Sequence, residues 1–258
     1  MKANFLIPVL STCLALTSAS AEKYSVMSKG HGGGGDDKKM FVGVSVGAGI
    51  PLANYGKSDT LNSSDTTHLT GWAKTGFHFN VKAGYYFTNN VGAMIQIGGN
   101  MNSYNSDALA KAEGLTAPAT VKATSNYIGS YLVGPCFKFP VSDKLTVEAR
   151  ALGGLMTAKL ATVTEDIPSF IKNEISYTAT KAFGYNVGLG LKYNVSDNIG
   201  ITLGADYLGG TPVFKEIKVN SSGTFFGVPF NESVTSGGHK LAMSTGVLNT
   251  TLGLTFNF

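Results

Sequence analysis

The sequence predicts an all-β protein, an eight-stranded antiparallel up-and-down transmembrane β-barrel with short periplasmic turns and long extracellular loops. Three observations lead to this fold class. From about residue 40 onward, apolar residues alternate with polar or small ones, which is typical of strands with one apolar face. Only 14% of the residues are charged, below the roughly 25% of soluble domains. Tight turns and long connections also alternate strictly along the chain.

The alternation defines the predicted strands one by one. In the first, Val42, Val44 and Val46 alternate with small residues, and the later strands repeat this period of two. The eight predicted strands are residues 40–50, 77–87, 91–98, 126–140, 145–157, 181–195, 199–210 and 245–258.

The face that meets the surroundings distinguishes two kinds of barrel. In the segment 145–157, Leu145 and Val147 share one side, and Glu148 and Arg150 share the other. A soluble, lipocalin-like barrel would bury the apolar side, whereas a membrane barrel turns it toward lipid and fills the lumen with polar residues. Low charge content, an N-terminal export signal and aromatic residues near the strand ends favour the membrane barrel.

The connections give the direction of the strands. Tight turns are predicted around Asn89-Asn90, Ser142-Asp143 and Ser196-Asp197, because these residues tolerate turn geometry. In an antiparallel meander, all such turns lie at one end of the barrel and all long loops at the other. The long loops are predicted near residues 51–74, 102–124, 159–179 and 212–243.

The N-terminus has the features of a secretory signal peptide. Lys2 precedes an apolar stretch from Phe5 to Leu16, and Ala19-Ser20-Ala21 forms a small-x-small cleavage site. We therefore expect three segments: a signal peptide at residues 1–21, a flexible glycine-rich tether at 22–39 and the barrel at 40–258.

Charge and cysteine content exclude two further classes. Loss of Lys2 with the signal peptide changes the net charge from +4 to +3. This charge is mild and dispersed, so we expect no nucleic-acid partner. Cys136 is the one cysteine outside the signal peptide, so the fold does not rest on internal disulfides.

The final segment is an apolar strand that runs to the last residue, with Leu252, Leu254, Phe256 and Phe258 on one side. Backbone groups at membrane depth must be paired, so we expect this strand to close the barrel. With this strand, the strand count and the rhythm of turns and loops, residues 40–258 resemble the small eight-stranded outer-membrane proteins of Gram-negative bacteria, the OmpA/OmpX/Opa type.

That resemblance implies a location in the cell outer membrane, in contact with outer-membrane lipid and lipopolysaccharide. It also implies that the strand ending in Phe258 is the signal read by the barrel assembly machinery. Pro135 departs from the family pattern, because proline lacks a backbone donor within the fourth predicted strand. We expect a bulge or a locally shortened strand there.

The predicted lumen contains charged residues, which allow two interpretations. They could line a selective channel, or form a buried ion network that plugs the barrel. Eight strands leave an interior that side chains can just fill, and buried charges must be paired, so we favour the plug. We expect Glu148 to pair with a cation such as Arg150 or Lys192. The predicted lumen residues are Lys82, Gln96, Lys138, Glu148, Arg150, Asn186, Lys192 and Asp206.

Motifs for catalysis, metals or cofactors are weak. The glycine-rich segment 30–37 lacks the Gly-Lys-Ser/Thr and the helix of a phosphate loop. The chain has no Gly-x-Ser-x-Gly and no His-x-x-x-His. We expect no metal, no cofactor and no enzymatic activity.

The long loops contain the remaining signals. Ser106 and Gly114 predict the cap and the end of a short helix, and Pro168 predicts the first turn of another. Four phenylalanines form either a loop core or an exposed contact patch, and both interpretations stay open: Phe170, Phe225, Phe226 and Phe230. We expect a surface-exposed structural protein, an adhesin-like antigen with host surface molecules as partners. The alternative is a small porin that conducts ions or small solutes.

Overall fold

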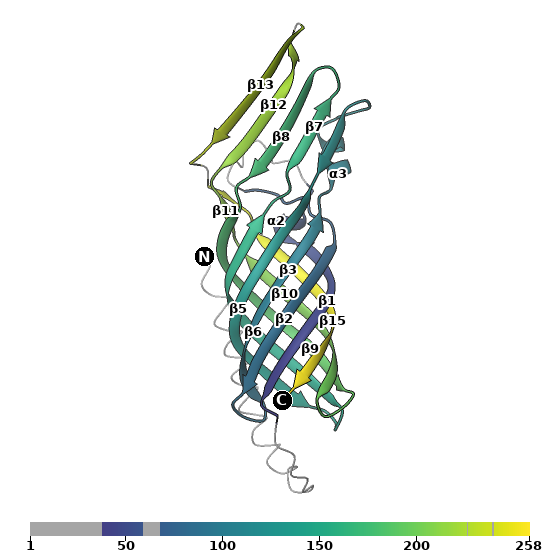
Figure 1. Ribbon diagram of the computed structural model, residues 1–258, viewed down its shortest axis with the longest axis vertical. Helices are drawn as coiled ribbons and strands as arrows, with labels where there is room; N and C mark the ends of the chain where they lie inside the picture. The colour runs from purple at the N-terminus through teal and green to yellow at the C-terminus, as the bar shows by residue number, and fades with distance from the viewer. Residues whose placement is uncertain (1–37, 59–67, 226, 239) are drawn as a thin grey trace. The chain divides into compact units, whose positions relative to one another are not determined.

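The computed structural model describes residues 38–58, 68–225, 227–238 and 240–258, and these residues form a closed barrel of eight strands with further strands at one end (Figure 1). The predicted signal peptide and all of the predicted tether except Lys38 and Lys39 lie outside the described residues. The barrel strands are β1 Met40–Leu52, β2 Gly76–Tyr86, β3 Val91–Ser103, β5 Ser125–Pro140, β6 Leu145–Lys159, β9 Thr180–Asn194, β10 Ile199–Gly210 and β15 Thr245–Asn257.

Each barrel strand pairs antiparallel with its neighbours in the order β1-β15-β10-β9-β6-β5-β3-β2, which confirms the predicted up-and-down barrel. Following cross-strand partners once around the barrel from Gly43 in β1 leads to Ala53, ten residues further along the chain and just beyond β1. With a rise of about 3.3 Å per residue and about 4.8 Å between strands, this displacement tilts the strands by roughly 40° from the barrel axis.

The three tight turns between strands share one device. A hydroxyl at the start of each turn accepts a hydrogen bond from the backbone N–H three residues later, which fixes the reversal. The pairs are Thr88 with Val91 at 3.0 Å, Ser142 with Leu145 at 3.1 Å and Ser196 with Ile199 at 3.2 Å. The turns lie where the sequence predicted them, all at the same end of the barrel (Figure 1).

The last strand closes the barrel against the first. β15 pairs with β1 from Phe41–Asn257 to Leu52–Gly246. At the seam the Phe258 N–H donates to the Met40 carbonyl at 2.9 Å, and the Met40 N–H donates to the Phe258 carbonyl at 3.3 Å. The terminal strand therefore leaves no free edge along the barrel.

The two faces of the wall have opposite polarity. Outward-pointing aliphatic residues are exposed, for example Val81 at 46% and Leu203 at 58%, whereas inward-pointing Lys82 and Asp206 are only 3% and 1% exposed. This inverted arrangement is that of a barrel surrounded by lipid. No helix among the described residues is both long and apolar enough to span a membrane.

Pro135 is accommodated without the expected bulge or shortening. β5 runs unbroken past it, and the register with β6 is the same on both sides, since Val133 pairs with Gly153 and Cys136 with Arg150. Only the pairing of residues 134 and 135 with β6 is missing. The absent proline N–H therefore interrupts one ladder locally without shifting the strand.

The long connections are largely ordered rather than irregular. The connections after β3, β6 and β10 contribute to one five-stranded sheet in the order β13-β12-β8-β7-β4, here called the loop sheet. Its strands are β4 Thr120–Ala123, β7 Val163–Ile167, β8 Ile171–Tyr177, β12 Ile217–Phe225 and β13 Val228–Ser236. The other elements at this end are α2 Ala53–Gly56, α3 Ser106–Ala112, β11 Val213–Phe214 and β14 Leu241–Ala242.

Two local predictions in these connections need correction. The helix α3 is capped by Asn105, whose side chain accepts from the Ala108 N–H at 3.4 Å, and not by Ser106. Gly114 has a φ of 68° just beyond α3, consistent with the predicted end of the helix. The segment around Pro168 forms the β7–β8 turn and not a helical first turn. Proline suits the second position of a β-turn as well as a helix start.

Candidate functional site

The lumen contains one carboxylate between two ammonium groups. Glu148 Oε2 lies 3.3 Å from Lys82 Nζ, and Glu148 Oε1 lies 3.5 Å from Lys192 Nζ. All three side chains are buried. Glu148 thus pairs with Lys192, which the sequence suggested, and with Lys82, which it did not.

A second buried pair lies beside the first. Arg150 Nε and Nη2 donate to Asp206 Oδ1 and Oδ2 at 2.7 and 2.5 Å, a bidentate arrangement. Arg150, Gly188 and Asp206 occupy one cross-strand row. Because Gly188 has no side chain, the Asp206 carboxylate can lie across it to reach Arg150. We call Lys82, Glu148, Arg150, Lys192 and Asp206 the ion network.

The other predicted lumen residues also point inward. Lys138 lies nearer the turn end, with Nζ 4.4 Å from the centroid of the Tyr86 ring. Gln96 and Asn186 are buried, but Gln96 Oε1 and Asn186 Oδ1 have no hydrogen-bond partner among the described residues. Asn100 and Asn249, which the sequence analysis missed, are buried with unpaired side-chain atoms too.

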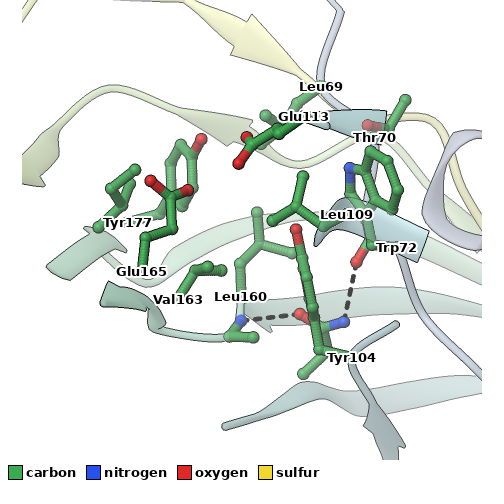
Figure 2. Close-up of a pocket in the computed structure, with 14 residues that line it drawn as sticks. Leu69, Thr70, Trp72, Tyr104, Leu109, Glu113, Leu160, Val163, Glu165 and Tyr177 are labelled. Atoms are coloured by element: carbon green, nitrogen blue, oxygen red, sulfur yellow. Dashed lines mark hydrogen bonds between the residues drawn. The ribbon is translucent and has the colours of Figure 1, made fainter. Parts of the chain in front are cut away.

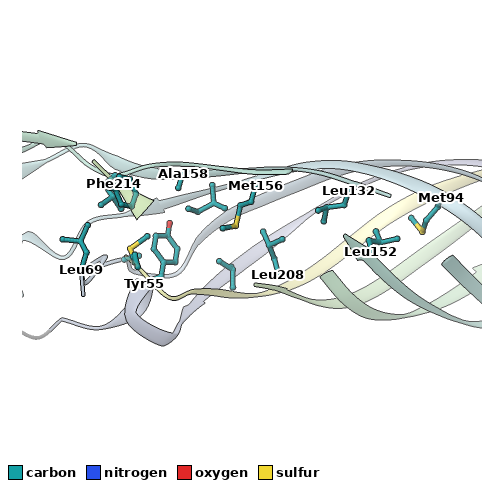
Figure 3. Close-up of a cluster of buried hydrophobic side chains, with 14 of the residues drawn as sticks. Tyr55, Leu69, Met94, Leu132, Leu152, Met156, Ala158, Leu208 and Phe214 are labelled. Atoms are coloured by element: carbon teal, nitrogen blue, oxygen red, sulfur yellow. The ribbon is translucent and has the colours of Figure 1, made fainter. Parts of the chain in front are cut away.

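Apolar side chains also enter the lumen, and the sequence analysis missed them. Figure 3 shows Leu132, Leu152, Met156 and Leu208 inside the barrel wall, and these side chains are 4% exposed or less. The inward orientation of such side chains could have been predicted from the alternation along β5, where Leu132 lies on the same side as the buried Asn126 and Ser130. The lumen is therefore filled by apolar as well as polar side chains.

The space beside the ion network is small. A cavity of about 10 Å³ is lined by Lys82, Glu148 and Arg150 together with Phe41 and Tyr86. A single water molecule needs about 10–15 Å³. This cavity therefore has room for no more than one water.

The predicted phenylalanine patch is only partly described. Phe170 lies in the β7–β8 turn, 69% exposed, and its carbonyl accepts from the Thr224 N–H at 3.1 Å. Phe230 of β13 is half-buried and pairs with Gly223 of β12. These two residues lie at the same end of the loop sheet. The Phe225 side chain and all of Phe226 lie outside the described part of the chain.

The predicted assembly signal lies on the outer face of β15. Leu252, Leu254 and Phe256 are 58%, 44% and 38% exposed, and Phe258 is 63% exposed. Their role in assembly stays a prediction. Within the described residues, no group of three or more histidine, cysteine, aspartate or glutamate side chains could hold a metal ion.

Comparison with known proteins identifies a family and several solved structures similar to this chain. Residues 11–231 match the sequence profile described as outer membrane protein beta-barrel domain. Among solved structures, Neisserial surface protein A is 11% identical, with 85% of this chain and 97% of that chain covered at a TM-score of 0.40. Ail of Yersinia pestis is 13% identical, with 85% of this chain and 99% of that chain covered at a TM-score of 0.41. The protease OmpT of Escherichia coli is 12% identical, with 86% of this chain and 97% of that chain covered at a TM-score of 0.49. These likenesses concern the fold alone. No curated protein matches the chain.

Proposed function

Because this chain belongs to the outer membrane protein β-barrel family, we propose that it is a surface protein whose barrel is a structural anchor and whose extracellular strands contact host molecules, as an adhesin or antigen does. The barrel sits in outer-membrane lipid and lipopolysaccharide. We further propose that the barrel assembly machinery inserts it, guided by the alternating final strand.

The loop sheet is the observation that carries this proposal. Three extracellular connections are joined into one sheet by continuous strand pairing from β4 to β13. A sheet of this kind holds side chains in fixed positions beyond the membrane, as a contact surface requires. At its outer edge, β13 exposes Val228 at 66% and Val234 at 57%.

The side chains that fill the lumen favour a structural anchor over a porin that conducts solutes. The paired ion network and the buried leucines occupy the interior, and such a core stabilises the wall without offering a path. A small porin is the second candidate, favoured by one observation: the unpaired buried amide atoms of Gln96, Asn100 and Asn249 would be satisfied by lumen water.

We assign the chain no catalytic role. The two histidines that the structure describes lie apart: His78 is in the lumen, 3.1 Å from the Asn80 side chain, and His68 is in the first extracellular connection. His31 and His239 lie outside the described residues.

Removal of the outer hairpin tests the proposal. Ile217 and Ser236 are cross-strand partners at the base of the hairpin, so residues 218–235 can be replaced by Asn-Gly, a pair that favours tight hairpin turns. The buried Phe214 and Met243 near the barrel mouth are retained. We expect export, insertion and heat-modifiable migration to persist, and attachment of expressing cells to host cells or matrix to fall.

The matched control places Asn-Gly at Ser142-Asp143, in a turn at the opposite end of the barrel. It should leave attachment unchanged. Uptake of small solutes is measured in the same strains. Unchanged attachment together with increased uptake in the hairpin variant would support the porin and contradict the surface-contact function.

A further inference from the structure

A pocket of about 230 Å³ lies between the barrel mouth and the loop sheet, here called the rim pocket. Its floor and walls are apolar, with buried Leu69, Leu109, Leu160 and Val163. Aromatic side chains from three separate segments complete it: Trp72, Tyr104 and Tyr177. Figure 2 shows these side chains around one common space.

The rim pocket also contains two carboxyl groups. Glu113 follows α3, Glu165 belongs to β7, and their side chains point toward each other (Figure 2). The Glu165 carboxylate lies close enough to Glu113 to disfavour a negative charge there. Among the described residues, neither glutamate forms an ion pair.

The Glu113 side chain is exposed and that of Glu165 is half-buried. Partial burial of its carboxyl group and the neighbouring Glu165 carboxylate raise the pKa of Glu113. The other titratable side chain facing this pair from the loop sheet is Tyr177 of β8, and Tyr104 faces it from the end of β3. On α3, Asp107 is already paired with Lys74 at 3.6 Å, and Lys111 lies in the last turn. A cation bound between the two carboxyl groups would therefore relieve the repulsion between them.

The aromatic wall is held by the backbone. Trp72 has a φ of 49°, a left-handed conformation that is costly for a bulky residue. Its N–H donates to the Lys57 carbonyl at 3.1 Å, and its carbonyl accepts from the Asn105 N–H at 2.8 Å. Asn126 supports the same segment by donating to the Gly71 carbonyl at 3.0 Å. Trp72 is thus fixed in place before any ligand arrives.

We propose that the rim pocket binds a small alkylammonium ion, with the ammonium group between Glu113 and Glu165 and the alkyl tail against Leu109, Leu160 and Val163. The three N–H donors of a primary ammonium match two carboxylates, and the ring of Trp72 or Tyr104 adds a cation–π attraction. Its volume of about 230 Å³ is many times what one water needs, so the pocket has room for a short alkyl chain and an ammonium group. This matches a short amine such as n-hexylammonium.

The test uses the full chain refolded in lipid nanodiscs, with n-hexylammonium as the probe. Trp72 is the one tryptophan of the chain and lines the pocket, so its fluorescence reports binding at this site. We expect a saturable change with n-hexylammonium and none with n-hexanol, which has the tail but no charge. The affinity should rise as pH increases through the pKa of Glu113, because loss of its proton adds a negative charge that attracts the cation.

Two variants show whether the carboxyls are responsible. The double substitution Glu113→Gln/Glu165→Gln should weaken binding about tenfold or more and abolish its pH dependence. The matched control is Glu174→Gln, which removes the same charge from β8 on the opposite face of the sheet, where Glu174 pairs with Thr164 and not with the pocket row. It should bind like the unmodified chain.

The same ammonium group could belong to a free amine or to a lysine side chain of a partner, and Nα-acetyl-lysine amide distinguishes them. Binding of n-hexylammonium alone assigns the site to free amines, whereas tighter binding of the lysine derivative assigns it to a partner's lysine. Equal affinity for n-hexanol and n-hexylammonium, or unchanged affinity in the double variant, would overturn the proposal. Loss of adhesion in the hairpin variant is a separate result that this titration does not affect.

Discussion

The barrel and the loop sheet are both antiparallel β-structure, yet they are stabilised differently. Every barrel strand has two partners, so the barrel has no edge. The loop sheet is open, with β13 and β4 at its edges. One row across it runs from Val163 on β7, 6% exposed, through Ile175 and Val219 to Val234 on β13, 57% exposed.

This gradient has a physical cause. Leu109 of α3 and Trp72 cover the β4–β7 side of the sheet and bury Val163, while nothing among the described residues covers β13 to the same degree. The barrel thus obtains its stability from closure and from the lumen, and the sheet from one small apolar cluster. Changes in the lumen should affect the whole molecule, whereas changes in the sheet should stay local.

The largest effect is expected from Arg150→Leu. It leaves the Asp206 carboxylate buried without its bidentate partner, and breaking one member of a buried pair typically costs about 3–5 kcal/mol. The free energy of unfolding, measured by urea titration in detergent, should fall by about this amount. The double variant Arg150→Leu/Asp206→Leu should lose less than the sum of the two single variants. Additive losses would contradict direct pairing.

Gly188→Ala should have the next largest effect. A Cβ at position 188 would collide with the Asp206 carboxylate, whereas the nearest atom to a Cβ at Gly190 is 3.5 Å away. Overpacking of this kind costs typically 1–3 kcal/mol. Gly190→Ala, on the same inward face of β9, is the matched control and should unfold like the unmodified chain. Equal midpoints for the two variants would mean that Asp206 moves aside without loss.

Val163→Ala should act on the sheet alone. Removing two buried methyl groups costs roughly 1–2 kcal/mol. Here this cost should lower the free energy of local opening of the loop sheet and leave the free energy of unfolding of the barrel unchanged. We expect faster hydrogen exchange in β7 and β8, with an unchanged urea midpoint for the barrel. Val234→Ala lies in the same row but is exposed, so it should change neither measurement. A shifted barrel midpoint for Val163→Ala would show that barrel and sheet unfold together.

The smallest effect is expected from pH. Burial and Glu165 raise the pKa of Glu113 above its ordinary value of 4.5. Its contribution to the stability of the sheet is therefore fully present below pH 4.5 and is lost as pH rises through the raised pKa. Cleavage of the extracellular strands by added protease should become faster over this range. In Glu113→Gln the cleavage rate should lose this component of its pH dependence.

Much of the barrel could be predicted from the sequence because lipid outside and a packed lumen inside impose a period of two on every strand. Val81 and Lys82 illustrate this: adjacent in the chain, they are 46% and 3% exposed. The tight turns were also predictable, since Thr88, Ser142 and Ser196 supply the hydroxyl that fixes each reversal.

The pairing within the lumen could not be predicted, because it depends on register between strands. Glu148 and Arg150 share an inward face, but Arg150 reaches Asp206 two strands away across Gly188. The loop sheet had no sequence signal of comparable strength, since most residues of its short strands are half-buried or, in β13, exposed. The rim pocket was missed for the same reason: Glu113 and Glu165 lie far apart in the sequence and meet only when α3 and β7 pack together.

The two hydrogen bonds between Met40 and Phe258 make the folded barrel a ring in which the seam resembles any other strand pair. A ring can be opened elsewhere. A circular permutant that joins residue 258 to residue 40 through a short linker, and begins at Asp143 behind the same signal peptide, would keep every strand pair of the wall. In that chain β15 still pairs with β1, but the new ends lie at β6 and β5, and Phe258 is no longer a terminal residue. Refolding in detergent without insertion in cells would then assign Phe258 to delivery rather than to the folded state.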